Sequence, residues 1–119
     1  MKEMYERTVV IGIFTLVYQY TRPLRFVGLT MYGSCIVKDP FELHRLGIFL
    51  KAYVSNRLSA GEHPVNAGVV LYRERVGHEE FIMLKAGDLI APMDKTTAME
   101  MQSILERFIS RIDLFDIPL

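Results

Sequence analysis

The sequence has few features that could cross-link the fold covalently or attach it to nucleic acid or a membrane. Its 119 residues include one cysteine, Cys35, which excludes an internal disulfide and fits a reducing compartment. The 14 basic and 14 acidic residues give a formal net charge of zero, so no overall field draws the chain to nucleic acid or anionic lipid. No apolar run reaches the roughly 18 residues that a membrane helix needs. We therefore expect a cytoplasmic protein that does not enter a membrane.

The motifs that bind metals, phosphates or nucleotide cofactors are also missing. The three histidines, His44, His63 and His78, are far apart, and neither paired-cysteine nor paired-histidine spacing occurs. Gly28 and Gly33 lie within a strand-like pattern and lack the residues of a phosphate-binding loop. The sequence therefore predicts neither a metal site nor a bound cofactor.

The chain does contain enough apolar material for a core. Half of its residues are hydrophobic, and its length is that of one domain, so we assign residues 1–119 to a single domain. A positive mean hydropathy combined with zero net charge is typical of a surface that self-associates. This combination favours a homo-oligomer.

The clearest predicted element is a helix over 39–59. Asp39 can cap its first turn, Pro40 suits the first helical position, and Gly61 suits a left-handed stop. One apolar stripe recurs at the helical period, which indicates the face that packs on a core. This stripe consists of Leu43, Leu46, Leu50, Tyr53, Val54 and Leu58.

Strands are predicted on both sides of this helix. The runs 8–20 and 25–37 are rich in β-branched and aromatic residues, which predicts two long strands joined by a turn at 21–24. The runs 69–75 and 80–85 form a second predicted hairpin around Gly77. Residues 60–66 are expected to be a loop and 86–93 a connector.

A second helix is predicted from about 95 to 114, capped either by Thr97 with Glu100 or by Asp94. The predicted order is therefore ββαββα. Two hairpin-plus-helix units indicate an α+β domain, with an antiparallel sheet made of the two hairpins and both helices packed on one face.

The strongest catalytic candidate combines Cys35 with His44 and Asp39. A thiolate activated by an imidazole, which a carboxylate orients, is the arrangement of cysteine-dependent enzymes. Asp39 already serves as a cap, however, and strand alternation places Cys35 on an apolar face, where an inert buried thiol is common. We therefore predict a core cysteine and no enzyme, with a small cysteine-dependent enzyme as a third alternative.

Basic and aromatic residues gather near the ends of the two predicted hairpins. The group consists of Arg22, Arg25, Arg73, Arg75, Tyr18 and Tyr20. Cations interleaved with aromatics on a sheet can bind single-stranded nucleic acid. Because Glu74, Glu79 and Glu80 lie in the second hairpin, we favour ordinary solvated hairpin ends and keep nucleic-acid binding as the alternative.

The predicted partner surface lies on the first helix. Phe41, His44, Ile48 and Ala52 share one stripe, and Met99 lies on the polar side of the second helix. A loop or tail of the same chain could cover this stripe, as could a second protein. We expect a small non-enzymatic protein-binding module (an adaptor, regulator or inhibitor) that acts as a homodimer and also binds another protein.

Overall fold

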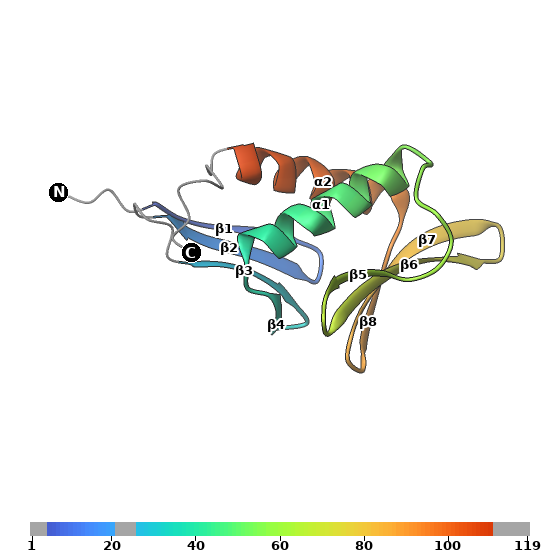
Figure 1. Ribbon diagram of the computed structural model, residues 1–119, viewed down its shortest axis with the longest axis horizontal. Helices are drawn as coiled ribbons and strands as arrows, with labels where there is room; N and C mark the ends of the chain where they lie inside the picture. Colours follow the sequence, from blue (N-terminus) through green and yellow to red (C-terminus); the bar gives the residue numbers. More distant parts are fainter. Residues whose placement is uncertain (1–4, 21–25, 111–119) are drawn as a thin grey trace.

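Two helices and eight strands make up the computed structural model, which describes residues 5–20 and 26–110. In chain order the elements are β1 (Tyr5–Ile11), β2 (Phe14–Tyr20), β3 (Phe26–Met31), β4 (Ser34–Val37), α1 (Pro40–Val54), β5 (His63–Asn66), β6 (Val69–Val76), β7 (Glu79–Ala86), β8 (Leu89–Met93) and α2 (Lys95–Ser110). Strands β1 to β4 form sheet A and β5 to β8 form sheet B, each an antiparallel meander in chain order. The helices run antiparallel, side by side, over both sheets (Figure 1).

The predicted α+β class is confirmed, but the predicted order and single sheet are wrong. The observed order is ββββαββββα, with two sheets. Both long strands expected before α1 are hairpins. Gly12, with a φ of 59°, lies in the first turn, and Tyr32 and Gly33, with φ of 52° and 81°, form the second. Neither turn carries the Asn-Gly or Asp-Gly signal of a tight hairpin, so each run looks continuous.

The hairpin predicted around Gly77 is confirmed as β6 and β7. The predicted loop over 60–66 and connector over 86–93 are wrong in part, because they contain β5 and β8. Each of these short strands includes a proline, Pro64 or Pro92, and proline argues against a strand within a sheet. Both strands are edges of sheet B, where a missing amide is tolerated. The turn expected at 21–24 lies outside the described residues.

Both helices begin at an aspartate. Asp39 Oδ1 accepts a hydrogen bond of 2.7 Å from the amide of Phe41, which confirms the predicted cap of α1. Asp94 Oδ1 accepts a 2.7 Å bond from the amide of Thr97, so Asp94 caps α2 and Thr97 does not. The hydrogen bonds from Thr97 lower the pKa of Asp94 below its ordinary value.

The first helix ends earlier than predicted. It stops at Val54, because Asn56 adopts a left-handed φ of 57°, the stop expected of Gly61. The amide of Arg57 then donates a 2.7 Å bond to the carbonyl of Ala52, which closes the end of the helix. Within the described residues no helix is long and apolar enough to cross a bilayer.

The two halves of the chain repeat each other at a spacing of 55 residues. The helix caps Asp39 and Asp94 have this spacing, and the strand pairings β2–β3 and β6–β7 have the same register at this offset. Further equivalent buried pairs are Leu16 and Leu71, Leu29 and Leu84, and Leu50 and Leu105. The buried residues of both halves form one hydrophobic core between the helices and the sheets.

Candidate protein-binding site on the helix pair

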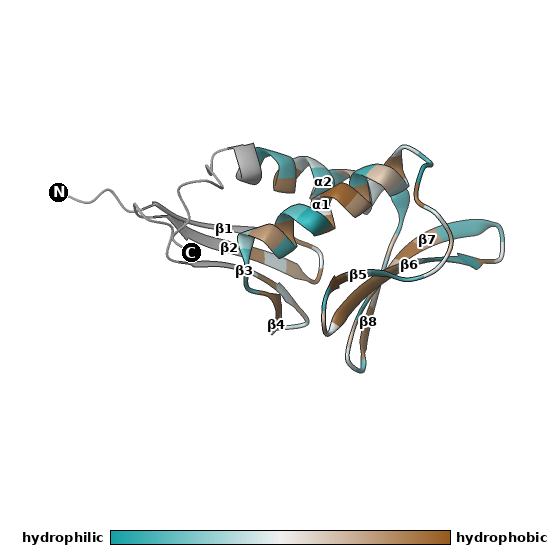
Figure 2. Cartoon of the chain, in the orientation of Figure 1, coloured by the Kyte–Doolittle hydropathy of each residue, from teal (hydrophilic) through white to brown (hydrophobic). Residues whose placement is uncertain are grey.

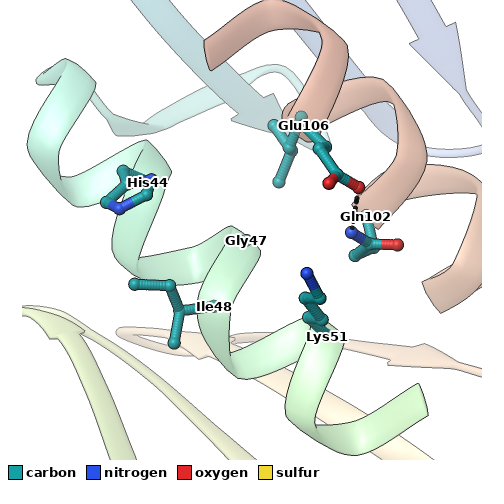
Figure 3. Close-up of a pocket in the computed structure, with 7 residues that line it drawn as sticks. His44, Gly47, Ile48, Lys51, Gln102 and Glu106 are labelled. Carbon is teal, nitrogen blue, oxygen red and sulfur yellow. Dashed lines mark hydrogen bonds between the residues drawn. The ribbon is translucent and has the colours of Figure 1, made fainter. Parts of the chain in front are cut away.

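A pocket of 280 Å³ lies between α1 and α2 (Figure 3). Its lining residues are His44, Gly47, Ile48 and Lys51 from α1, and Gln102, Leu105 and Glu106 from α2. The core-facing residues of α1, such as Leu43 and Leu50, are fully buried, whereas His44, Ile48 and Lys51 are exposed. The pocket therefore opens on the solvent side of the helix pair.

Gly47 creates the space in this pocket. A Cβ added at Gly47 would lie 3.8 Å from the Cβ of Leu105, so the two helices are in van der Waals range there. The repeat counterpart of Gly47, 55 residues later, is Gln102, which lines the same pocket. The missing side chain on α1 leaves room, and the buried Leu105 supplies an apolar floor.

The charged side chains around the pocket differ in whether they have a hydrogen-bond partner among the described residues. Gln102 Nε2 donates a hydrogen bond of 2.8 Å to Glu106 Oε2, so this carboxylate already has a partner on its own helix. Lys51 points toward α2 (Figure 3), and the described residues give its ammonium group no hydrogen bond or ion pair. The pocket thus combines an apolar floor with a cation at its rim that the described part of the chain leaves without a partner.

Two of the predicted interface residues, His44 and Ile48, line this pocket. The exposed fractions of Phe41, Ile48 and Met99 are 43%, 52% and 52%, so the described part of the chain leaves them largely uncovered. Ala52 is half-buried and packs against the core. Sequence reasoning missed the other lining residues, although Gly47 and Lys51 follow His44 at helical spacing.

The predicted burial of Cys35 is wrong. The thiol is exposed, and it donates a weak 3.4 Å hydrogen bond to the carbonyl of Val37. The turn at 32–33 pairs Cys35 with Thr30, and so places it on the outer face of sheet A rather than the core face. The Asp39 carboxylate caps α1, and the Cys35 thiol bonds to the carbonyl of Val37. In the described structure neither group is hydrogen-bonded to His44.

The predicted nucleic-acid group is only partly described. Arg22 and Arg25 lie outside the described residues, and Tyr18 and Tyr20 belong to β2, with side chains outside the described part. Arg73 and Arg75 are exposed on β6. Their side chains alternate with that of Tyr72, so the sheet separates these cations from the neighbouring aromatic ring.

Comparison with known proteins adds no assignment: no protein-family model, no curated protein and no solved structure matches the chain. Among the described residues, no three potential ligands gather in a group that could hold a metal ion.

Proposed function

We propose that the protein is a non-catalytic cytoplasmic binding module, an adaptor, regulator or inhibitor, that acts as a homodimer. In this proposal the groove between α1 and α2 takes a segment of another protein that carries an apolar anchor next to a carboxylate. The observation that carries the proposal is the Lys51 ammonium group, which has no partner among residues 5–20 and 26–110, beside the exposed Ile48 and the apolar floor of the pocket.

The apolar part of the site supplies the affinity. Ile48 is 52% exposed, and Phe41 extends the same stripe by two helical turns toward the start of α1. Burying a fully exposed side chain of this size contributes about 1.5–3 kcal/mol, so covering the exposed half of Ile48 contributes about half as much. An inserted apolar side chain that also covers Ile48 would form the buried centre of a larger interface.

The charge at the rim supplies the selectivity. Lys51 and His44 lie on the α1 side of the pocket, and the acid on the other side, Glu106, is engaged by Gln102. A segment with aspartate or glutamate beside its anchor complements Lys51, whereas a basic segment meets repulsion. Charges at the rim of an interface act mainly on association rate and salt dependence.

A peptide-display selection on the purified protein tests the proposal. We expect enriched peptides to combine an apolar residue with an acidic neighbour and to bind the wild type in a fluorescence anisotropy titration. Ile48→Asp should abolish that binding, and Lys51→Glu should weaken it and reduce its salt dependence. The matched control is Val10→Asp, because Val10 is 66% exposed on β1, outside the pocket, and should leave binding unchanged.

Equal binding of the peptides by the wild type and Ile48→Asp would contradict the proposal, and so would enrichment of basic peptides. The nucleic-acid alternative makes a different prediction. It requires salt-dependent retention of the wild type on single-stranded DNA, lost when both Arg73 and Arg75 are changed to Glu.

A further inference from the structure

The face of sheet B that points away from the helices is apolar. The strand register sets Tyr72 beside Met83 and Met83 beside Pro92, across β6, β7 and β8. Residues on the other face of these strands, including Leu71 and Leu84, are buried under the helices. The outward apolar set, named here the sheet B patch, consists of Val70, Tyr72, Phe81, Met83, Ile90 and Pro92.

This patch is open to solvent within the described structure. Ile90 is 42% exposed, Pro92 is exposed, and the other four members are half-buried. The strands of sheet B are brown over much of their length in Figure 2, with hydrophilic residues toward the β6–β7 turn. An antiparallel sheet with one solvated face normally carries polar residues on that face, and a contiguous apolar patch on a soluble protein marks an interaction site.

Sheet A is an internal control for this feature. Its β2–β3 pairing has the register of β6–β7 at an offset of 55 residues, so the patch positions on β6 and β7 have counterparts on its outer face. Pro92 has none, because Val37 is paired with Leu29 and buried in the core. The counterparts of Val70, Met83 and Ile90 are small or polar: Thr15, Gly28 and Cys35. At the positions of Tyr72 and Phe81, sheet A has apolar residues as well. The fold therefore accepts a less apolar outer face, and the larger apolar side chains of sheet B are not required for packing.

The charges bordering the patch are self-complementary. Residues that are paired across neighbouring strands form a row. Glu74 is exposed in the row of Phe81, and Lys85 is exposed in the row of Ile90. These two rows lie on either side of the Tyr72–Met83 row. A twofold axis across the strands at the Tyr72–Met83 row lays each strand over its own copy and reverses the row order, so Lys85 comes over the Glu74–Phe81 row of the other copy, one strand away from Glu74. An axis along the strands brings Lys85 over Lys85. Both arrangements are isologous, and only the first is charge-matched.

We propose that two copies of this chain associate face to face through the sheet B patch, with the strands aligned in reversed row order and Lys85 of each subunit beside the partner's Glu74. This inference rests on the homodimer in the proposed function, and it assigns that dimer to a surface separate from the α1–α2 groove. Two sheets packed in this way interdigitate their inner side chains with a layer spacing of about 10 Å.

Sedimentation velocity over a range of concentrations tests the interface. We expect the wild type to be dimeric, and Met83→Asp and Ile90→Asp to be monomeric with unchanged far-ultraviolet circular dichroism. Ile48→Asp should remain dimeric while losing the peptides that bind the groove. A dimer that resists both sheet substitutions would overturn the inference, as would a monomeric wild type. A monomer that still binds acidic peptides would leave the function of the groove intact.

Charge reversal and cross-linking test the arrangement of the two copies. Lys85→Glu should weaken the dimer about tenfold, since two symmetric pairs turn repulsive, and adding Glu74→Lys should restore it. In a Cys35→Ser background, Met83→Cys lies near the twofold axis and should be linked by a short bifunctional maleimide, whereas Ile48→Cys should not. Failure of the double charge reversal to restore association would contradict the reversed row order.

Discussion

At the scale of single residues, Tyr53 shows how one side chain joins α1 to sheet B. Tyr53 is buried at the last turn of the helix, and its hydroxyl group donates a hydrogen bond of 3.2 Å to the carbonyl of Glu80 on β7. Burial raises the pKa of Tyr53, and the nearby carboxylates of Glu80 and Asp94 raise it further. The folded protein therefore holds the phenol proton more tightly than the unfolded chain does.

Tyr53→Phe is expected to lower the free energy of unfolding by about 1 kcal/mol at pH 7, because one buried hydrogen bond is lost. The stability that the phenol contributes is fully present below pH 10.0, its ordinary pKa, and is lost as pH rises through the higher folded value. Urea titrations of both proteins at neutral pH and above pH 10 measure this. The stability advantage of the wild type should shrink at the higher pH, and a constant difference would contradict the assignment.

Cys35 shows why exposure of a residue was hard to predict from the sequence. Alternation along one continuous strand puts Cys35 on the same face as the buried Leu29 and Met31. The unrecognised turn at 32–33 pairs Cys35 with Thr30 instead, which moves it to the opposite face. The missed two-residue turn therefore inverts the predicted face of Cys35. The irregularity between Leu29 and Thr30 then pairs Val37 with Leu29 and returns Val37 to the core face.

At the scale of elements, Gly47 is the point where α1 meets α2 and where the pocket opens. It is helical, so its conformation suits any residue, and an added Cβ would make an ordinary contact of 3.8 Å with Leu105. Gly47→Ala is therefore expected to raise the free energy of unfolding by about 0.5–1 kcal/mol through helix propensity.

Gly77→Ala is the matched control for this prediction. Gly77 has open space around it but a φ of 64°, so the same added methyl group should destabilise the β6–β7 turn. Thermal unfolding of the two variants against the wild type measures both effects. Destabilisation by Gly47→Ala would show that the two helices are closer than a methyl group allows.

Elements with strong local signals were predicted, and elements set by tertiary pairing were not. The caps, the buried stripe of α1 and the β6–β7 hairpin follow from local chemistry. The short edge strands β5 and β8 carry prolines, and their pairing with β6 and β7 decides their conformation. Likewise, His44 and Ile48 were predicted from α1 alone, whereas the pocket also needs residues of α2, which only the packing of the two helices brings near.

At the scale of the whole molecule, the repeat raises the question of whether its two halves are independent. Each ββββα unit has its own sheet, but the helices pack on each other and the buried residues of both units form one core. Leu50 and Leu105 are equivalent positions in this core, with exposed fractions of 0% and 1%. A shared core predicts that the two units unfold together.

Leu50→Ala and Leu105→Ala distinguish cooperative from independent units. Each substitution should lower the free energy of unfolding by about 2–5 kcal/mol, because it leaves a cavity at a fully buried position. If the core is shared, each variant shows a single urea transition, shifted to lower midpoint in both far-ultraviolet circular dichroism and tyrosine fluorescence. If the units are independent, each substitution shifts only one of two transitions. Urea titrations are repeated with each leucine substitution in the Ile90→Asp variant, which is expected to be monomeric. At equal protein concentration, these separate the cooperativity of the two units from the effect of dimer dissociation.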